Sequence, residues 1–145
     1  MFHHIDISVL CQATEDKAKV REAMTFISGS TAEVSEMIFS GTSKNTITLL
    51  SCKLTKQREF EAFFKHLQDA GAVKDIMAEL LDRFDEDLFL NLRFNKQEAY
   101  LQRFVLATKD PHGGVIDVRC RVKAYPAKFE VGLKAINEYL EGMMA

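Results

Sequence analysis

The sequence predicts an α+β fold, a two-layer sandwich in which helices cover one face of a mostly antiparallel sheet. Several short runs alternate apolar and polar residues, as half-buried strands do, while other runs repeat apolar residues at helical spacing. Both kinds of run are interspersed along a chain of 145 residues with 47% hydrophobic and 28% charged residues. This is ordinary globular composition without a linker, so we expect a single domain over residues 1–145.

The N-terminal part predicts a strand, a helix and a hairpin. The alternation of the first strand places four residues on one side, namely Ile5, Ile7, Val9 and Cys11. Thr14 is expected to cap the following helix, and Ser28-Gly29-Ser30 to end it. Val34–Phe39 and Ile47–Leu54 then predict two strands, joined by the polar loop Gly41–Asn45.

Two amphipathic helices are predicted next, separated at Ala70-Gly71-Ala72. The apolar side of the first consists of Phe60, Phe63, Phe64 and Leu67. The single stripe of the second consists of Val73, Ile76, Met77, Leu80, Leu81 and Phe84. Aromatic residues at this spacing usually face a core, so both helices are expected to pack on the sheet.

The next segment predicts a strand over Leu88–Phe94 and a short helix with Asn95 as its cap. A short strand over Phe104–Ala107 and a turn over Asp110–Gly114 follow. The chain closes with a helix whose apolar residues are Phe129, Leu133, Ile136 and Leu140.

The clearest alternation in the chain covers residues 115–125 and predicts a strand ended by Pro126. One side carries Ile116, Val118, Cys120, Val122 and Ala124, and the other carries Asp117, Arg119, Arg121, Lys123 and Tyr125. We therefore expect a row of three cations on the sheet face that helices leave uncovered, with Arg93 facing the same way.

The net charge of −2 counts against a strongly basic nucleic-acid binder, but the charge is unevenly distributed. Residues 1–90 carry 10 Lys+Arg and 15 Asp+Glu, whereas residues 91–128 carry 8 against 3. The sequence thus permits a basic patch built from its second half.

Catalytic and metal-binding motifs are absent from the sequence. It has no phosphate-binding glycine loop, no nucleophile elbow and no zinc-protease motif, and His66 and His112 lack partners at useful spacing. Its three cysteines form no C-x-x-C pair. We therefore expect that the protein is not an enzyme and that it binds neither a metal nor a cofactor. The alternative is a Mg²⁺-dependent nuclease that uses Asp82, Asp85 or Asp87. With no secretion signal and no membrane-length apolar run, a cytoplasmic protein without membrane contact is expected.

Cations interleaved with tyrosines favour RNA as the partner, because cations neutralise phosphates and aromatic rings stack on unpaired bases. The residues concerned are Arg93, Lys96, Tyr100, Arg103, Arg119, Arg121, Lys123, Tyr125 and Lys128.

The segments FNKQEAYLQRF and VRCRVKAYPAK resemble a small archaeal family of predicted RNA-binding proteins, some of them predicted exosome subunits. ATEDKAKVREA and LTKQREFEAFF fit the same family, so the resemblance extends over nearly the whole chain. It implies an archaeal, cytoplasmic protein with a fold similar to the ribosomal protein of the large subunit that binds 5S RNA. Carried over to matching positions, it implies a surface formed by Lys96, Gln97, Tyr100, Arg119, Arg121, Lys123, Tyr125 and Lys128.

Two functions follow as expectations. The first is a non-enzymatic RNA-binding accessory protein, associated with RNA processing or the exosome, that contacts RNA through the basic sheet face and the adjacent helical turn. The alternative is an adaptor subunit of an RNA-processing or ribosomal assembly without direct RNA contact, which would use the acidic first half and the strand Val34–Phe39. A homodimer formed through an exposed edge strand is compatible with both.

Overall fold

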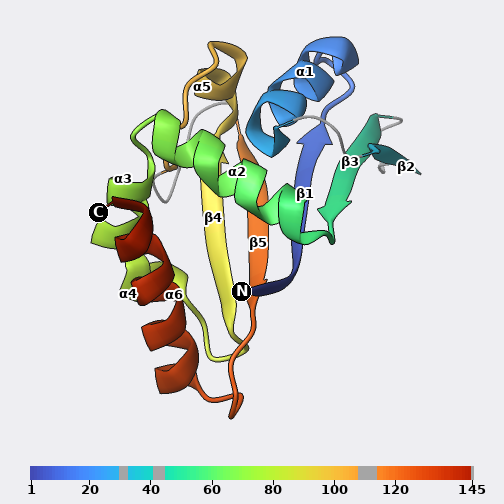
Figure 1. Cartoon of the computed structure of the whole chain (residues 1–145). Coiled ribbons are helices and arrows are strands. Elements are labelled where there is room, and N and C mark those ends of the chain that lie inside the picture. The colour runs from blue at the N-terminus through green and yellow to red at the C-terminus, as the bar shows by residue number, and fades with distance from the viewer. Residues whose placement is uncertain (30–32, 41–44, 108–113, 145) are drawn as a thin grey trace.

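The computed structural model describes residues 1–29, 33–40, 45–107 and 114–144. One five-stranded sheet, in which every neighbouring pair is antiparallel, has the order β2-β3-β1-β5-β4 (Figure 1). In chain order the strands are β1 (Phe2–Cys11), β2 (Ser35–Ser40), β3 (Thr46–Leu54), β4 (Phe89–Asn95) and β5 (Val115–Val122). The two edges of this sheet are therefore β2 and β4.

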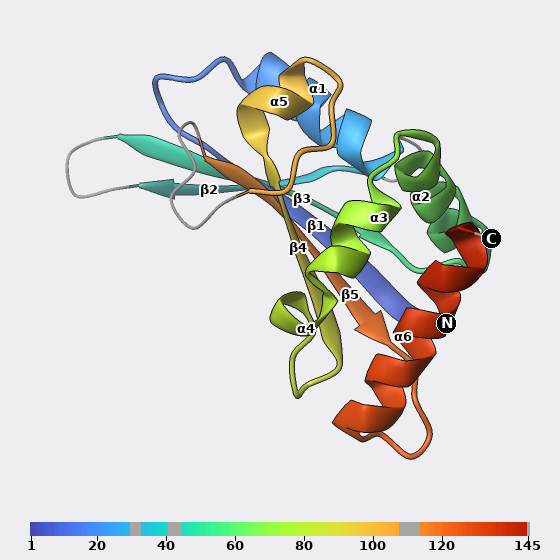
Figure 2. The ribbon, with the colours of Figure 1, turned by 90° about the vertical axis from the view of Figure 1, so that its left-hand side faces the viewer.

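The helices lie mainly on one side of the sheet, as Figure 2 shows for the four that form the second layer. These are α1 (Lys17–Ser28), α2 (Gln57–Asp69), α3 (Val73–Ala78) and α6 (Phe129–Met144). Two short helices, α4 (Leu80–Arg83) and α5 (Lys96–Tyr100), lie next to β4. The predicted α+β two-layer sandwich is confirmed, and the opposite sheet face is open to solvent. No helix in the described ranges is both long and apolar enough to cross a bilayer.

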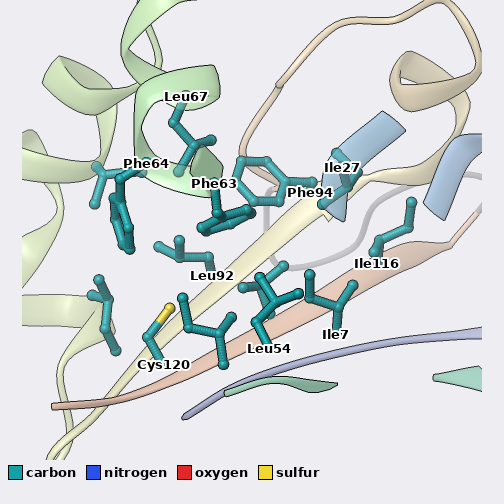
Figure 3. Packing of buried hydrophobic residues seen from close by; sticks show 14 of the residues in the cluster. Ile7, Ile27, Leu54, Phe63, Phe64, Leu67, Leu92, Phe94, Ile116 and Cys120 are labelled. Atoms are coloured by element: carbon teal, nitrogen blue, oxygen red, sulfur yellow. The ribbon is translucent and has the colours of Figure 1, made fainter. Parts of the chain in front are cut away.

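The core fills the space between the sheet and the helical layer (Figure 3). Every second residue of the three inner strands points into it, and α2 contributes Phe63 and Phe64, both fully buried. Each such side chain stabilises the fold by about 1.5–3 kcal/mol relative to an exposed one. The three cysteines are buried here as well, and burial raises the pKa of Cys52 to about 11, which keeps that thiol uncharged.

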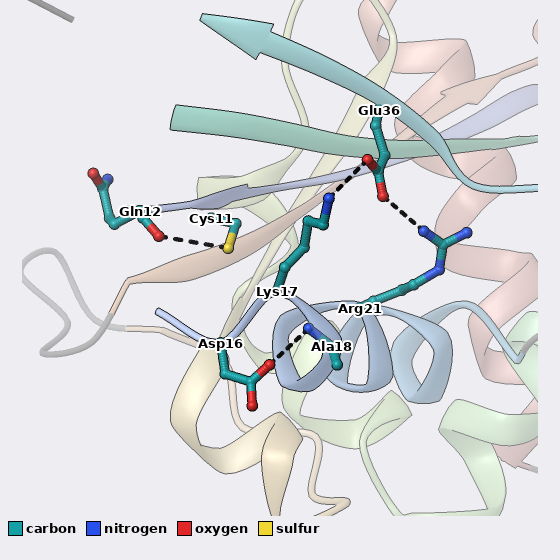
Figure 4. A network of polar contacts seen from close by, with 7 residues as sticks. All are labelled: Cys11, Gln12, Asp16, Lys17, Ala18, Arg21 and Glu36. Carbon is teal, nitrogen blue, oxygen red and sulfur yellow. Dashed lines mark hydrogen bonds and ion pairs between the residues drawn. The ribbon is translucent and has the colours of Figure 1, made fainter. Parts of the chain in front are cut away.

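The first helix begins later than predicted. Asp16, rather than Thr14, is the cap of α1, because its carboxylate Oδ1 accepts a hydrogen bond from the Ala18 amide at 3.0 Å (Figure 4). Gly29, with φ of 78°, ends the helix as the sequence suggests. The predicted cap of the short helix is confirmed, since Asn95 Oδ1 accepts from the Glu98 amide.

The prediction of a single helix from Val73 onward is wrong. The backbone leaves helical geometry at Glu79 (φ −117°, ψ 18°), so α3 and α4 are separate. The break turns Leu80 and Phe84 inward but leaves Leu81 71% exposed. The apolar residues from Val73 to Phe84 therefore do not lie on one side of a single continuous helix.

Two predicted strand limits also differ. Phe104–Ala107 forms no strand, only an isolated bridge between Leu106 and Phe94. β5 ends at Val122, so Tyr125 lies beyond the sheet and is 98% exposed. The loop residues 41–44 and the turn residues 110–113, with His112, lie outside the described residues.

Lys96, expected among the exposed cations, is buried at the start of α5. Its Nζ donates to the Leu10 carbonyl at 2.8 Å and to Glu15 Oε1 at 3.0 Å. Glu15 in turn accepts from the Gln12 amide. One ammonium group thus connects α5 to the end of β1 and to the loop before α1.

We expect Lys96→Met to lower the free energy of unfolding by about 3 kcal/mol, because it leaves a largely buried carboxylate without its counter-charge. Lys17→Met is the matched control. It removes an exposed ion pair with Glu36 and should cost less than about 1 kcal/mol. Urea denaturation followed by circular dichroism measures both, and equal losses would contradict a buried-pair role.

Candidate nucleic-acid interface

A set of cations lies on the open face, as the alternation of β5 requires. Arg119 and Arg121 point away from the helical layer, Lys123 follows just after the strand, and Arg93 comes from neighbouring β4. We call these four residues the cationic zone. Arg93, Arg119 and Lys123 are exposed, and Arg121 is half-buried.

Arg93 is tied to the face by an exposed ion pair. The strand register puts it opposite Asp117, and its Nε lies 3.3 Å from Asp117 Oδ1. Both side chains are about half exposed (49% and 48%). Such a pair is worth at most about 1 kcal/mol, so an incoming anion can replace the carboxylate at little cost.

Arg119 is held in place from two sides. Its guanidinium carbon lies 4.0 Å from the centre of the Phe89 ring, and its Nε donates to Asn91 Oδ1 at 3.2 Å. Stacking on an aromatic face and a fixed hydrogen bond restrict the side chain before any ligand arrives. The remaining guanidinium N–H groups face solvent with a defined orientation.

A tight turn before β4 organises this arrangement. Asp85 accepts hydrogen bonds from the amides of Asp87 (2.9 Å) and Phe89 (3.0 Å), and from Asn91 Nδ2 (2.9 Å). Burial by itself would raise the pKa of Asp85. The three hydrogen bonds and the charge of Arg119 outweigh it and hold that pKa below its ordinary value. An ionised Asp85 therefore orients Asn91, which orients Arg119.

Arg121 uses the same turn. Its Nη1 donates to the Asp87 carbonyl at 2.7 Å, and its guanidinium carbon lies 5.2 Å from the Phe89 ring centre. Leu88 supports the turn with a left-handed backbone (φ 66°), its side chain buried and its carbonyl accepting from the Val122 amide. Two oriented arginines thus lie next to the Phe89 ring.

The neighbouring strand β1 brings mixed charge. Asp6 lies opposite Arg119 in the register, with Lys53 Nζ 4.0 Å from its carboxylate and His4 Nδ1 2.9 Å away. At the beginning of β1, the pairing with β5 shifts between Phe2 and His4, so His3 has no partner in the register. Burial, and then the charges of Lys123 and Arg121, lower the pKa of His3, so these two cations act on the imidazole.

Two predicted residues extend the cationic zone beyond the sheet. Tyr125 and Lys128 are exposed in the connection between β5 and α6, directly after Lys123. Of the ten predicted residues, the structure places Arg93, Arg119 and Arg121 on the open sheet face, and Lys123, Tyr125 and Lys128 in the exposed connection that follows β5.

The other four predicted residues lie around α5, at the opposite end of β4. Lys96 is buried, so its prediction as part of an exposed surface is wrong. Arg103 forms an ion pair with Glu98, its Nη1 lying 3.5 Å from Glu98 Oε2. Gln97 and Tyr100 line a shallow hollow with Lys19 and the three carboxylates of Glu15, Asp16 and Glu22. Burial, and then Glu15, Cys11 and Asp16, raise the pKa of Tyr100. Carboxylates here would repel phosphates.

Sequence reasoning missed the residues that orient the arginines. Phe89 and Asn91 alternate with Leu90 and Leu92, so their place on the same face as Arg93 is visible in the sequence. Their positions opposite Arg121 and Arg119 depend on the β4–β5 register, which no local pattern gives. Lys53 was missed because it stands alone in an apolar strand.

The described residues show no geometry for metal chemistry. No group of three His, Cys, Asp or Glu side chains in these ranges is placed to hold an ion. Asp85, a candidate for Mg²⁺ in the nuclease alternative, is engaged by three hydrogen-bond donors of its own turn.

Known proteins resemble this chain over most of its length. The RNA-binding protein PAB1135 of Pyrococcus abyssi is 31% identical over 97% of this chain and 94% of its own. Among solved structures, Mth689 of Methanothermobacter thermautotrophicus is 33% identical with a TM-score of 0.81, covering 97% of this chain and 98% of its own. Protein AF2318 of Archaeoglobus fulgidus is 30% identical with the same TM-score of 0.81, covering 95% and 99%.

A protein-family model described as RNA binding matches residues 4–122, a range that contains nearly the whole sheet and, of the cationic zone, Arg93, Arg119 and Arg121. This range is most of the chain. The three relatives above are archaeal proteins, and each matches at least 95% of this chain. The chain therefore belongs to this RNA-binding family.

Proposed function

We propose that the protein is a non-enzymatic accessory protein that binds RNA through the cationic zone of its open sheet face. The observation that supports this most is the pair Arg119 and Arg121, which the turn containing Asp85 orients next to Phe89. Donors held in place before binding lose less conformational entropy when a ligand arrives. Guanidinium groups also match phosphate oxygens in geometry and charge.

The arrangement suits contacts with the RNA backbone more than a sequence code. Phosphate contacts position a nucleic acid, whereas bases are specified by groups that reach their edges. The zone offers cations in a row two residues apart, about 6.7 Å along the strand. The exposed ring of Tyr125 offers a surface on which an unpaired base can stack.

Replacing Arg119, Arg121 and Lys123 together by alanine should abolish RNA binding without unfolding the protein, because all three lie on the solvent side of the sheet. The control replaces Lys19, Lys65 and Lys74, three exposed cations of the helical layer, and should bind as the wild type does. Fluorescence anisotropy with a labelled single-stranded RNA measures both. For the wild type, about 4–5 phosphate contacts give a slope near −3 for log affinity against log salt.

Asn91→Ala should weaken RNA binding by about 2- to 10-fold, the value of one hydrogen bond, because Arg119 loses the partner that orients it. Asn137→Ala is the matched control, since it removes an exposed amide on α6, far from the open face. The same anisotropy titration compares them. If Asn91→Ala binds RNA like the wild type, Arg119 needs no orienting partner and this part of the proposal is wrong.

RNA affinity should rise a few-fold as the pH falls from about 7.5 to about 5.5, the range in which histidine titrates. The reason is linkage: burial lowers the pKa of His3 most, and the charges of Lys123 and Arg121 lower it further. A phosphate that neutralises these two charges removes their part of the shift, so the complex takes up a proton. His3→Gln should flatten this profile, while His66→Gln, on the helical layer, should keep it. Affinity independent of pH would place the phosphates elsewhere.

Association with the exosome, a cytoplasmic location and a fold related to the 5S-RNA-binding ribosomal protein remain predictions of the sequence resemblance. The alternative of an adaptor without direct RNA contact, which is based on the acidic first half and the strand Val34–Phe39, also remains a prediction. Purification of the native protein separates these functions: co-purifying RNA, visible as a raised 260/280 nm absorbance ratio, supports direct binding. A stoichiometric protein partner without RNA supports the adaptor.

A further inference from the structure

The two edges of the sheet are protected to very different degrees. At β4, the Asn95 amide donates to the Val105 carbonyl at 2.8 Å, and the Ala107 amide donates to the Arg93 carbonyl at 2.7 Å. Segments 84–85 and 105–107 thus cover that edge. At β2, no described residue pairs with the outer side, and all six residues are exposed. A bare edge of this kind is a template for another strand.

β2 also has few of the residues that usually prevent an edge strand from pairing, since its one charged residue is Glu36. Its six residues include no Lys, Arg or Pro. Met37 (57% exposed) and Phe39 (46%) lie on the open face, and Ile38 (63%) lies on the other. On the open face the apolar surface continues to Leu10, which is 47% exposed and paired with Leu49. We call Leu10, Met37, Ile38 and Phe39 the apolar edge.

The charge of this region limits what can bind there. The only ionised residue of β2 is Glu36, and Lys17 (3.2 Å) and Arg21 (2.8 Å) of α1 already hold it (Figure 4). RNA phosphates would meet no cation on β2 or on the paired part of β3, residues 46–51. On β2 itself and on residues 46–51, a charged peptide would meet no charged side chain other than Glu36. A second copy of the chain brings an equally uncharged, equally apolar strip.

We propose that the chain forms a dimer in which β2 pairs antiparallel with β2 of a second copy, the two Ile38 residues lying opposite each other. This register sets Met37 opposite Phe39 twice on the open face and Ile38 opposite Ile38 on the helical face. Glu36 faces Ser40, so no like charges meet. A register centred on Met37 would instead set Ile38 against Glu36, which cross-strand pairing disfavours.

The dimer has a geometric consequence for the open face. Antiparallel pairing of identical edges places the two-fold axis perpendicular to the sheet, so both helical layers lie on one side. Two five-stranded sheets become one sheet of ten strands. The two cationic zones then share the opposite side, separated by the two apolar edges. The use of this pair of zones for RNA rests on the proposed function, whereas the dimer itself does not.

Sedimentation or size-exclusion chromatography with light scattering tests the dimer on the full chain. The wild type should have twice the mass of one chain, and Ile38→Lys should have the mass of one, with an unchanged circular dichroism spectrum. Leu81→Lys, a change at an equally exposed apolar residue on α4, is the matched control and should remain dimeric. A wild type that is monomeric at every concentration reached overturns the proposal.

Cysteine cross-linking tests the register. Directly opposed residues of an antiparallel pair have Cα atoms about 4.5–5.5 Å apart, within the span of a disulfide. Ile38→Cys should therefore form a covalent dimer under mild oxidation, whereas Ser35→Cys, on the same exposed strand, should not. The native cysteines are buried and do not compete. Cross-linking of Ser35→Cys but not Ile38→Cys would overturn the register.

The two proposals fail separately. If the cationic-zone triple variant loses RNA while the wild type is monomeric, the RNA interface stands and the dimer does not. If the wild type is dimeric but no variant changes RNA binding, the dimer stands alone. If Ile38→Lys or Met37→Lys weakens RNA binding in a protein that is monomeric throughout, the apolar edge contacts bases rather than a second copy.

Discussion

A sheet that is buried on one face must present every second side chain of each strand to water, and the rest of this structure depends on that constraint. In β5 the buried series is Ile116, Val118, Cys120 and Val122, and the exposed series carries Asp117, Arg119 and Arg121. Because β5 lies between β1 and β4, its arginines have neighbours on both sides. The hydrophobic core that stabilises the sandwich thus also fixes where its charges stand.

The turn before β4 restricts the conformations of Arg119 and Arg121 on the open face. Scattered surface arginines sample many conformations, and holding each of them costs entropy on binding. Here Asn91 Oδ1 accepts a hydrogen bond from Arg119, the Asp87 carbonyl accepts one from Arg121, and Asp85 holds Asn91 in place. Phe89 supplies the ring over which the guanidinium groups lie. An acidic cluster that looks like solvated surface in the sequence is in part the support of the cationic zone.

The sequence predicts most of the strands and helices because alternation and helical spacing are local properties. It also predicts that Arg93, Arg119, Arg121 and Lys123 share a face, which follows from strand parity alone. It misplaces Lys96, because burial of that ammonium depends on Glu15 and the Leu10 carbonyl, more than eighty residues away in the chain. It misses the break at Glu79 for a similar reason, since apolar spacing alone does not reveal where the backbone leaves helical geometry.

Helix α6 packs directly against the turn that contains Asp85, so the helical layer and this turn are in contact. Gly132 has no side chain, and a β-carbon there would lie 2.9 Å from both Leu88 Cδ2 and Phe84 Cζ. The C-terminal helix therefore rests directly on the residues whose backbone carries Asp87 and Phe89. A displacement of α6 at Gly132 would therefore also displace the turn that holds Arg119 and Arg121 on the other side of the sheet.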